Sequence, residues 1–508
     1  MVSRASRWGR ANRRASAAVR LEDKHGLVLL TALLCLAALI LTPMLAEDRR
    51  FHSDEAFFMT FARDAAVKGD WWLSGALDKP PLTIYAHAAL LSLIGIDTLP
   101  NGVLTLDVYK GEFVGRLLGF FSSMASLALA VRLTQDITYR AAAAAAVGLA
   151  LIALPLFQLY STTAFMDMPM VALALGALLA AHRGRLCASG ALLALAFCAK
   201  PQGIFFAPLV LWYAVQNGGW SQMLRWSVSA GAVLALLLIW DELRPSESVL
   251  LLGAANNGRL SLVLNASALL ERLQAWLSTE NSLSMWVAVL SAGLLHSRTR
   301  ALSSWALLYG LGHALIFDVL YERYLLPAAA VGVIGAAAAA ACLWKEHKRP
   351  RSWPRRAVSV GIAVSAAAWL AFANGGLINA HSAQPRQLLA DYPRSSQIDR
   401  IAADLNALPV ATVIYDHWLG WLLNYYMGAW HNKRIVYYPS PEALAAGIQA
   451  LAEDSPRYFL IPTDNTALYG LSTLWSSSWE EWLRRLQASF RVEELPAYGA
   501  IRVLRIYP

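Results

Sequence analysis

The sequence predicts a polytopic α-helical membrane protein with a small α/β domain at its C-terminal end. Of the 508 residues, 57% are hydrophobic and only 15% are charged, whereas a typical soluble domain has about 25% charged residues. The apolar residues gather in runs that approach the roughly 20 residues a membrane span needs. After the last run the pattern changes to short alternating strands and helices. This composition excludes both a soluble globular protein and a disordered chain.

The positive charge of the chain is distributed as in the cytoplasmic loops of membrane proteins. The formal net charge is +9, but the arginines form short clusters between apolar runs, so we expect no nucleic-acid partner. The cysteines all lie inside apolar runs, and we therefore expect no disulfide framework in an exported loop. They are Cys35, Cys187, Cys198 and Cys342.

About eleven apolar runs are long enough to cross a bilayer once flanking polar residues are included. The first follows the basic tail 1–25 and has no clear cleavage site, so we expect a retained span and not a signal peptide. The run 80–96 opens with two prolines, and we place it along the membrane interface. The expected spans are 26–46, 113–131, 141–157, 168–182, 186–199, 201–215, 226–240, 283–297, 301–317, 324–344 and 357–373.

The basic clusters determine the expected orientation. With the N-terminal tail inside and 80–96 not crossing, every compact cluster falls in a cytoplasmic connection, as the positive-inside rule requires. If 80–96 crossed, all of them would lie outside. We therefore expect a cytoplasmic N-terminus and an extracytoplasmic C-terminus. The Ala- and Arg-rich composition suits a high-GC bacterium, and we expect the protein in the bacterial inner (plasma) membrane. The cytoplasmic connections are 132–140, 183–185, 216–225, 298–300 and 345–356.

This topology divides the chain into a basic cytoplasmic tail (1–25), a transmembrane unit (26–375) and an extracytoplasmic α/β domain (376–508). Two outer loops are long: 47–112, with interfacial amphipathic stretches, and 241–282, where leucines are spaced as in a half-buried helix. In the C-terminal domain we expect strands at 411–415, 434–438, 457–462 and 502–507 and helices at 441–453 and 479–488.

Isolated charged residues gather at the outer ends of the expected spans. A charge costs roughly 2.5–3.5 kcal/mol at the bilayer centre, and such residues usually mark a pathway or a site. Any one of them could be an ordinary interfacial residue, but the one-sided set predicts a catalytic outer face. Its members are Asp54, Glu55, Asp78, Lys79, Asp167, Lys200, Asp241, Glu242, Asp318, Glu322 and Arg323.

Two motifs of the first outer loop combine groups that can do chemistry. Asp54 and Glu55 are adjacent carboxylates just after the first span, and an aspartate can accept the proton of an attacking hydroxyl or amine. Lys79 precedes Pro80 and Pro81, which fix the direction of the chain. A lysine can hold a phosphate as a point charge. The alternative is a solvated turn with an incidental ion pair.

These motifs, with others in the same order, resemble those of the GT-C membrane glycosyltransferases. The resemblance is closest to the protein O-mannosyltransferase and aminoarabinose transferase (ArnT-like) group, and it covers residues 26–345. It implies a GT-C fold and an inverting transfer of a sugar from a polyprenyl phosphate, such as undecaprenyl phosphate, to lipopolysaccharide, protein or another acceptor. The further matching segments are 111–116 (GEFVGR), 165–169 (FMDMP), 199–203 (AKPQG) and 321–327 (YERYLLP).

The resemblance also implies roles for single residues. Asp54, with Glu55 beside it, would be the base or the group that orients the acceptor, and Lys79 would contact the lipid phosphate of the donor. Lys200 would pair with Asp54; the alternative is a lysine that extends to the interface. The other expected members are Arg323 and Tyr324 as a phosphate clamp, Arg116, which either binds phosphate or pairs with Glu112, Asp167 at the acceptor site, and Asp78, where some relatives place a metal-binding carboxylate.

No cofactor is firmly expected. A divalent metal at Asp78 lacks a partner, because loop 241–282 contains no histidine and no His/Cys cluster has metal-ligand spacing. The expected partners are a polyprenyl-phosphate sugar, a lipid, glycan or protein acceptor, and the bilayer. The aromatic residues near His417, including Trp421, either stack against a sugar or pack the core of the small domain.

Two competing functions remain. A transporter or a flippase for a lipid-linked sugar usually has polar groups at mid-membrane and repeated halves, which this sequence lacks. A structural scaffold would leave the Asp-Glu and Lys-Pro-Pro motifs without a purpose.

Overall fold

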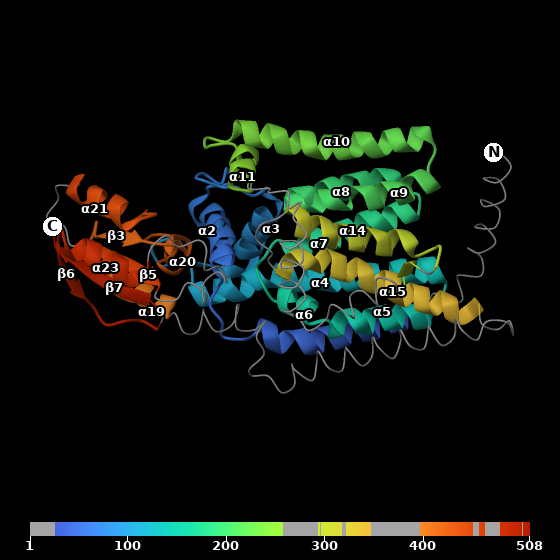
Figure 1. Ribbon diagram of the computed structural model, residues 1–508, viewed down its shortest axis with the longest axis horizontal. Helices are drawn as coiled ribbons and strands as arrows, with labels where there is room; N and C mark the ends of the chain where they lie inside the picture. The colour runs from blue at the N-terminus through green and yellow to red at the C-terminus, as the bar shows by residue number, and fades with distance from the viewer. Residues whose placement is uncertain are drawn as a thin grey trace.

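The computed structural model describes residues 26–257, 293–294, 296–316, 322–346, 397–450, 457–462, 478–499 and 501–507. Within them, long apolar helices form a bundle, and a small α/β domain lies at one end of it (Figure 1). The predicted span 357–373, most of span 283–297 and the leucine-rich helical pattern of the second outer loop lie outside the described residues.

The bundle confirms a polytopic helical membrane protein. By length and composition, four described helices could each cross a membrane, and α5 with α6 would make a fifth if this bent pair is one span. The count of eleven stays a prediction. The bundle consists of the helix Gly26–Leu45, α4 (Val108–Thr138), α5 (Ala141–Ala153), α6 (Pro155–Ser161), α7 (Asp167–His182), α8 (Leu186–Ala199), α9 (Ala207–Asn217), α10 (Trp220–Leu243), α14 (Arg300–Ile316) and α15 (Leu326–Glu346).

Proline and glycine shape the bundle at identifiable positions. Helices α5 and α6 meet at a bend of 67°, where Pro155 cannot donate the backbone hydrogen bond that would continue α5. Gly119 lets α4 approach the segment before α7, because a Cβ atom there would lie 2.3 Å from the carbonyl oxygen of Thr163. Small residues allow such close approach of backbones in membrane bundles.

The segment 47–112, predicted as the first outer loop, forms a layer between the bundle and the C-terminal domain (Figure 1). Helix α2 begins with a capping box, in which the side chain of His52 accepts from the backbone of Asp54 and Glu55 accepts from the backbone of His52. The elements of this layer are α2 (Ser53–Lys68), α3 (Leu82–Leu90), the π-helix η1 (Leu91–Gly95) and the hairpin of β1 (Ile96–Thr98) and β2 (Leu104–Leu106).

The C-terminal domain is built on a mixed five-stranded sheet of order β4-β3-β5-β7-β6. Strands β4, β3 and β5 are parallel, and β7 is antiparallel to both β5 and β6. The predicted strands and helices of this domain are confirmed; α19, α20 and β6 are additional. The elements are α19 (Ile398–Ala407), β3 (Val413–Asp416), α20 (Gly420–Tyr426), β4 (Arg434–Tyr437), α21 (Pro441–Ala450), β5 (Arg457–Pro462), α23 (Trp479–Gln487), β6 (Arg491–Glu494) and β7 (Ile501–Tyr507).

The two faces of this sheet have different partners because side chains alternate along a strand. Val413 and Tyr415 of β3 belong to a core with Trp482 of α23. Ile414, between them, belongs to the core that the domain shares with the bundle, together with Leu422 of α20. The sheet is therefore covered by α21 and α23 on one face and held to the rest of the protein through the other.

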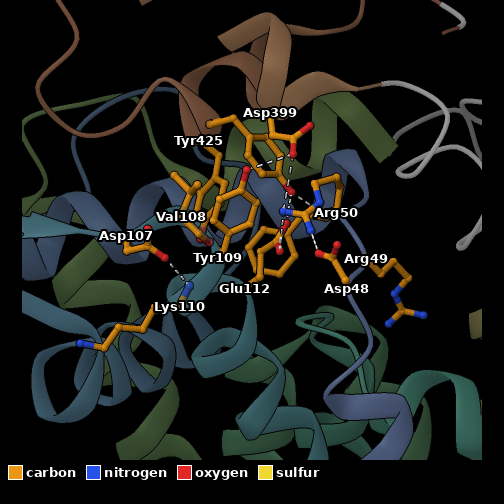
Figure 2. A network of polar contacts seen from close by, with 12 residues as sticks. Asp48, Arg49, Arg50, Asp107, Val108, Tyr109, Lys110, Glu112, Asp399 and Tyr425 are labelled. Carbon is orange, nitrogen blue, oxygen red and sulfur yellow. Dashed lines mark hydrogen bonds and ion pairs between the residues drawn. The ribbon is translucent and has the colours of Figure 1, made fainter. Parts of the chain in front are cut away.

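Polar contacts fix the C-terminal domain to the bundle (Figure 2). The buried guanidinium of Arg50 lies 3.2 Å from Glu112 of α4 and 3.9 Å from Asp399 of α19. The hydroxyl of Tyr109 donates to Asp399 at 3.1 Å, and that of Tyr425 donates to the first carbonyl of α4 at 3.0 Å. These contacts hold α19 and α20 against the first turn of α4.

Candidate active site

A cavity of about 450 Å³ is lined by residues of α2, α7, α11 (Val249–Asn257), α20 and the 3₁₀ turn η3 (Glu322–Leu325), and of the segments before α3, before α7 and after α8. This volume is typical of small-ligand sites, which span about 300–1,000 Å³. Seven of the nine residues predicted to form the site line the cavity, although they come from distant parts of the chain. They are Asp54, Asp78, Lys79, Asp167, Lys200, Arg323 and Tyr324.

The charged residues of the cavity form three ion pairs, each of one cation and one carboxylate. The formal charge of this set is therefore balanced, and each cation that an anionic ligand would contact already has a carboxylate partner. The pairs are Arg323 Nη2–Asp54 Oδ2 at 2.6 Å, Lys79 Nζ–Asp78 Oδ2 at 2.7 Å and Lys200 Nζ–Asp167 Oδ1 at 2.6 Å.

The partner of Lys200 differs from the expected one. Lys200 was expected to pair with Asp54, but it contacts Asp167, while Asp54 contacts Arg323. Lys200 stands in an extended conformation (φ −156°, ψ 131°) between the end of α8 and Pro201, because a proline disfavours the helical conformation in the residue before it. From there its side chain reaches the first residue of α7, where Asp167 is almost fully buried.

Asp54 is held in its ionised form. Burial raises the pKa of this carboxyl, but the charge of Arg323 and its hydrogen bond, with a smaller contribution from His52, outweigh burial and lower the pKa to about 2. The position of Asp54 in the first turn of α2 also favours a negative charge. As long as Arg323 is its partner, Asp54 is a weak proton acceptor.

Aromatic rings hold the cations Arg323 and Lys200 in place. The guanidinium of Arg323 lies 4.7 Å from the ring centre of Phe165, and Lys200 Nζ lies 4.7 Å from that of Tyr324. Such cation–π contacts fix a charged side chain without neutralising its charge. Tyr324 therefore lines the cavity as a support for Lys200, in addition to the phosphate-binding role expected for it.

Glu55 lies outside the cavity lining, although the sequence placed it beside the predicted base. Its carboxylate accepts from the backbone N–H of His52 at 2.8 Å and from that of Ala164 at 2.7 Å, and the residue is buried. Each oxygen has a backbone donor. Glu55 thus caps α2 and ties its start to the segment before α7, which positions Asp54.

Arg116 also lies outside the cavity lining. It is buried, donates to the backbone carbonyl of Arg49 and covers the ring of Phe51 at 5.3 Å. Glu112, its alternative partner in the sequence analysis, forms its ion pair with Arg50. Arg116 thus holds the segment that leads into α2 against α4.

Eight of the fifteen lining residues were not predicted as site residues, and two of these, Asn256 and Trp421, bear on the chemistry of the cavity. Asn256 of α11 donates to Asp78 Oδ2 at 3.2 Å. Trp421 of α20 belongs to the C-terminal domain. Its aromatic segment was noted in the sequence, but which of its residues face a cavity depends on how the domain docks. His417 of the same segment is buried against Trp482 and belongs to the domain core.

No metal site is found in the described part of the chain, where no group of three or more His, Cys, Asp and Glu side chains is arranged to hold an ion. Asp78, the residue considered for a metal, contacts Lys79 and Asn256.

No model of a known protein family matches the chain, and no curated protein matches it in sequence. The fold is similar to that of ArnT from Cupriavidus metallidurans bound to undecaprenyl phosphate, with a TM-score of 0.61 and 16% identity over 94% of this chain and 97% of that chain. The apo form of the same protein gives a TM-score of 0.58 and 16% identity over 97% and 98%.

The match to the Pmt1–Pmt2 protein O-mannosyltransferase complex of S. cerevisiae bound to its sugar donor is much weaker. It has a TM-score of 0.34 and 17% identity over 44% of this chain and 34% of that chain, which is too slight to support an inference. The ArnT-like fold that the sequence motifs predicted is therefore confirmed by the likeness to ArnT, and that likeness concerns the fold alone.

Proposed function

We propose that this protein is an inverting glycosyltransferase that moves a sugar from a polyprenyl phosphate to a lipid, glycan or protein acceptor. The observation that carries the proposal is the cavity with three ion pairs at one end of an apolar helix bundle. A lipid-linked donor has the matching order of parts: an apolar chain, then an anionic phosphate, then a polar sugar. The similar fold of ArnT, which binds undecaprenyl phosphate, supports this choice of ligand.

The residues of the cavity can supply each part of a single displacement. The acceptor oxygen or nitrogen attacks the anomeric carbon, and the bond from this carbon to the phosphate oxygen breaks. The phosphate leaves with the electron pair, and Lys79 and Arg323 stabilise the charge that develops on it. Asp54 takes the acceptor proton. One displacement inverts the anomeric configuration.

The pair of Asp54 and Arg323 connects donor binding with the base. A donor phosphate competes with Asp54 for the guanidinium of Arg323, because both are oxyanions that bind the same N–H groups. When Arg323 turns to the phosphate, the main cause of the low pKa of Asp54 is removed, and its pKa rises toward the ordinary value of 3.8. The base then becomes a better proton acceptor only when a donor is present.

The proposed orientation places the cavity at the outer face of the inner membrane. Helix α4 begins beside the C-terminal domain, where Val108 accepts from Tyr425, and it ends at the opposite end of the bundle. Basic residues gather at that opposite end: Arg183 pairs with Asp136 at 2.6 Å, and Arg298 donates to Ile137 at 3.2 Å. The positive-inside rule would make this end cytoplasmic and the C-terminal domain extracytoplasmic. Eleven spans, with domain limits at 375 and 376, remain part of this proposal.

The proposal is tested by transfer in liposomes. The purified protein is given undecaprenyl phosphate loaded with radiolabelled hexoses or pentoses, with bacterial membrane extract as the source of acceptor. We expect acceptor-dependent release of undecaprenyl phosphate by the wild type and its loss in Lys79→Ala. Lys110→Ala is the matched control, because Lys110 pairs with Asp97 at 2.7 Å and does not line the cavity. Movement of labelled lipid across the bilayer without cleavage would contradict the proposal and favour a flippase.

A further inference from the structure

We propose that Trp421, a residue of the C-terminal domain, is the platform on which the ring of the donor sugar rests. The proposal rests on the function proposed above, since it assigns a place to the sugar of the same donor. It makes the C-terminal domain a source of sugar specificity and not only a cover for the bundle.

The position of Trp421 supports a ligand contact. The residue lines the same cavity as Lys79 and Arg323, and it is 38% exposed, which is a large fraction for an aromatic side chain enclosed between two packed units. Its ring meets that of Phe57 edge to face at 4.4 Å and lies tilted against that of Phe61 at 5.6 Å. Both phenylalanines belong to α2, the helix that carries Asp54. The part of the indole that they leave uncovered borders the cavity.

The C-terminal end of α20 is anchored, so that Trp421 is presented rigidly. Arg63 of α2 donates to the carbonyls of Asn424 and Tyr425, at 2.7 and 3.1 Å, which are among the last carbonyls of this short helix. The hydroxyl of Tyr426 accepts from the backbone of Phe51 at 2.6 Å.

The N-terminal end of α20 is held as well. Asp416, at the end of β3, accepts from the backbone N–H of Leu419 at 2.9 Å. Because α20 is fixed at both ends, Trp421 loses little conformational freedom when a ligand binds. This is the arrangement expected of a preorganised binding residue.

The order of parts in the donor identifies what reaches Trp421. The polyprenyl chain must stay with the apolar bundle, and the phosphate is expected at Lys79 and Arg323. The C-terminal domain lies beyond α2 as seen from the bundle (Figure 1), so the part of the donor that extends toward α20 is the sugar. The face of an aromatic ring is negative, and it attracts the C–H groups that a sugar ring presents on its flat side.

Three variants distinguish this role from simple packing. Trp421→Leu keeps an apolar side chain against Phe57 and removes the aromatic face, whereas Trp421→Phe keeps both. Trp430→Leu is the matched control: Trp430 lies in the same domain, is 56% exposed, and donates from its indole to Leu104 at 2.8 Å, but it does not line the cavity. Each variant is purified as the full chain and its melting temperature is recorded.

The measurement is the affinity for undecaprenyl phosphate without a sugar and for undecaprenyl phosphate carrying a hexose or a pentose. In the wild type, we expect at least one sugar-loaded lipid to bind more tightly than the bare lipid. In Trp421→Leu, the increase in affinity that the sugar provides should fall by about tenfold, which is the size of one good aromatic contact. The affinity for the bare lipid should stay unchanged. Trp421→Phe and Trp430→Leu should keep the gain.

Three results would overturn the proposal. They are an unchanged gain in Trp421→Leu, an equal loss of affinity for bare and sugar-loaded lipid in that variant, and a wild type that binds no sugar-loaded lipid more tightly than the bare one. Failure of the proposed function would look different, because the wild type would then bind the bare lipid no better than Lys79→Ala does.

Discussion

Arg323 Nη2 lies 2.6 Å from Asp54 Oδ2, and this contact joins two residues that are 269 positions apart in the chain. It links the start of α2, in the layer next to the C-terminal domain, to the turn before α15 in the bundle. The contact places the proposed base and one proposed phosphate ligand in a single ion pair. In the proposed mechanism, the donor phosphate and Asp54 therefore compete for the guanidinium of Arg323.

Asp54→Asn separates the two tasks. The amide cannot accept a proton, so turnover should fall by roughly 10²–10⁴-fold, the usual contribution of a positioned general base. The same change frees Arg323 from its carboxylate, and the affinity for undecaprenyl phosphate should stay equal or increase. Turnover, lipid affinity and melting temperature are measured on one preparation. Full turnover in Asp54→Asn would exclude the base, and a loss of lipid affinity would show that the ion pair serves the fold.

Asp416 should make the stability of the C-terminal domain depend on pH. Burial raises the pKa of this carboxyl to about 6 from the ordinary 3.8, against hydrogen bonds from the backbone of Leu419 and Gly420 that lower it. Between these two pH values the folded state binds more protons than the unfolded state. The contribution of Asp416 to the free energy of unfolding is therefore greatest below about pH 4 and is lost as the pH rises through 6.

Asp416→Asn tests this dependence, since an asparagine is neutral at every pH and keeps an oxygen that can accept from Leu419. We expect the variant to melt at a higher temperature than the wild type at pH 7.5, with a smaller difference at pH 4.5. Thermal unfolding of both proteins at the two pH values is the measurement. An equal difference at both would contradict the raised pKa.

Tyr426→Phe should loosen the C-terminal domain from the bundle. The buried hydroxyl accepts from the backbone of Phe51 and donates to Glu112, and a buried polar group left without its partner costs about 1–3 kcal/mol. The variant should melt earlier and be cleaved faster by a protease between the bundle and the domain. Tyr498→Phe is the control, because its hydroxyl contacts Asp404 at an exposed site. Equal effects of the two variants would mean that the Tyr426 contact does not hold the domain.

The orientation can be read from reporter fusions. Fusions after residues 140, 185, 300 and 350 should report the cytoplasm, because these positions follow or lie within basic clusters. A fusion after residue 400 should report the opposite side of the membrane. An exported signal from the fusion at 350 would contradict the eleven-span arrangement.

Sequence motifs predicted the charged residues of the cavity better than their pairing. Lys79 and Lys200 each stand before a proline, which fixes their backbone and makes their motif recognisable. The packing of α2, α7 and η3 determines which carboxylate each cation contacts. This packing cannot be predicted from a local sequence pattern. Lys200 was therefore assigned to the wrong aspartate.

Other differences have similar causes. Glu55 carries the same chemical group as Asp54, but one position along a helix turns its side chain toward backbone donors. Trp421 reaches the cavity only because an entire domain docks on α2. In the C-terminal domain, the strands that were predicted contain runs of apolar and aromatic residues, whereas β6 (Arg491–Glu494) is polar and largely exposed and was not predicted.

Binding of undecaprenyl phosphate to the purified protein tests the central claim most directly. The account predicts that Lys79→Ala and Arg323→Ala each raise the dissociation constant by about 10- to 100-fold, since a hydrogen bond to a charged group contributes about 1.5–3 kcal/mol. Lys110→Ala should bind as the wild type does, and all variants should keep their melting temperature within a few degrees. Wild-type affinity in both Lys79→Ala and Arg323→Ala would contradict the account, because the phosphate would then bind elsewhere than in this cavity.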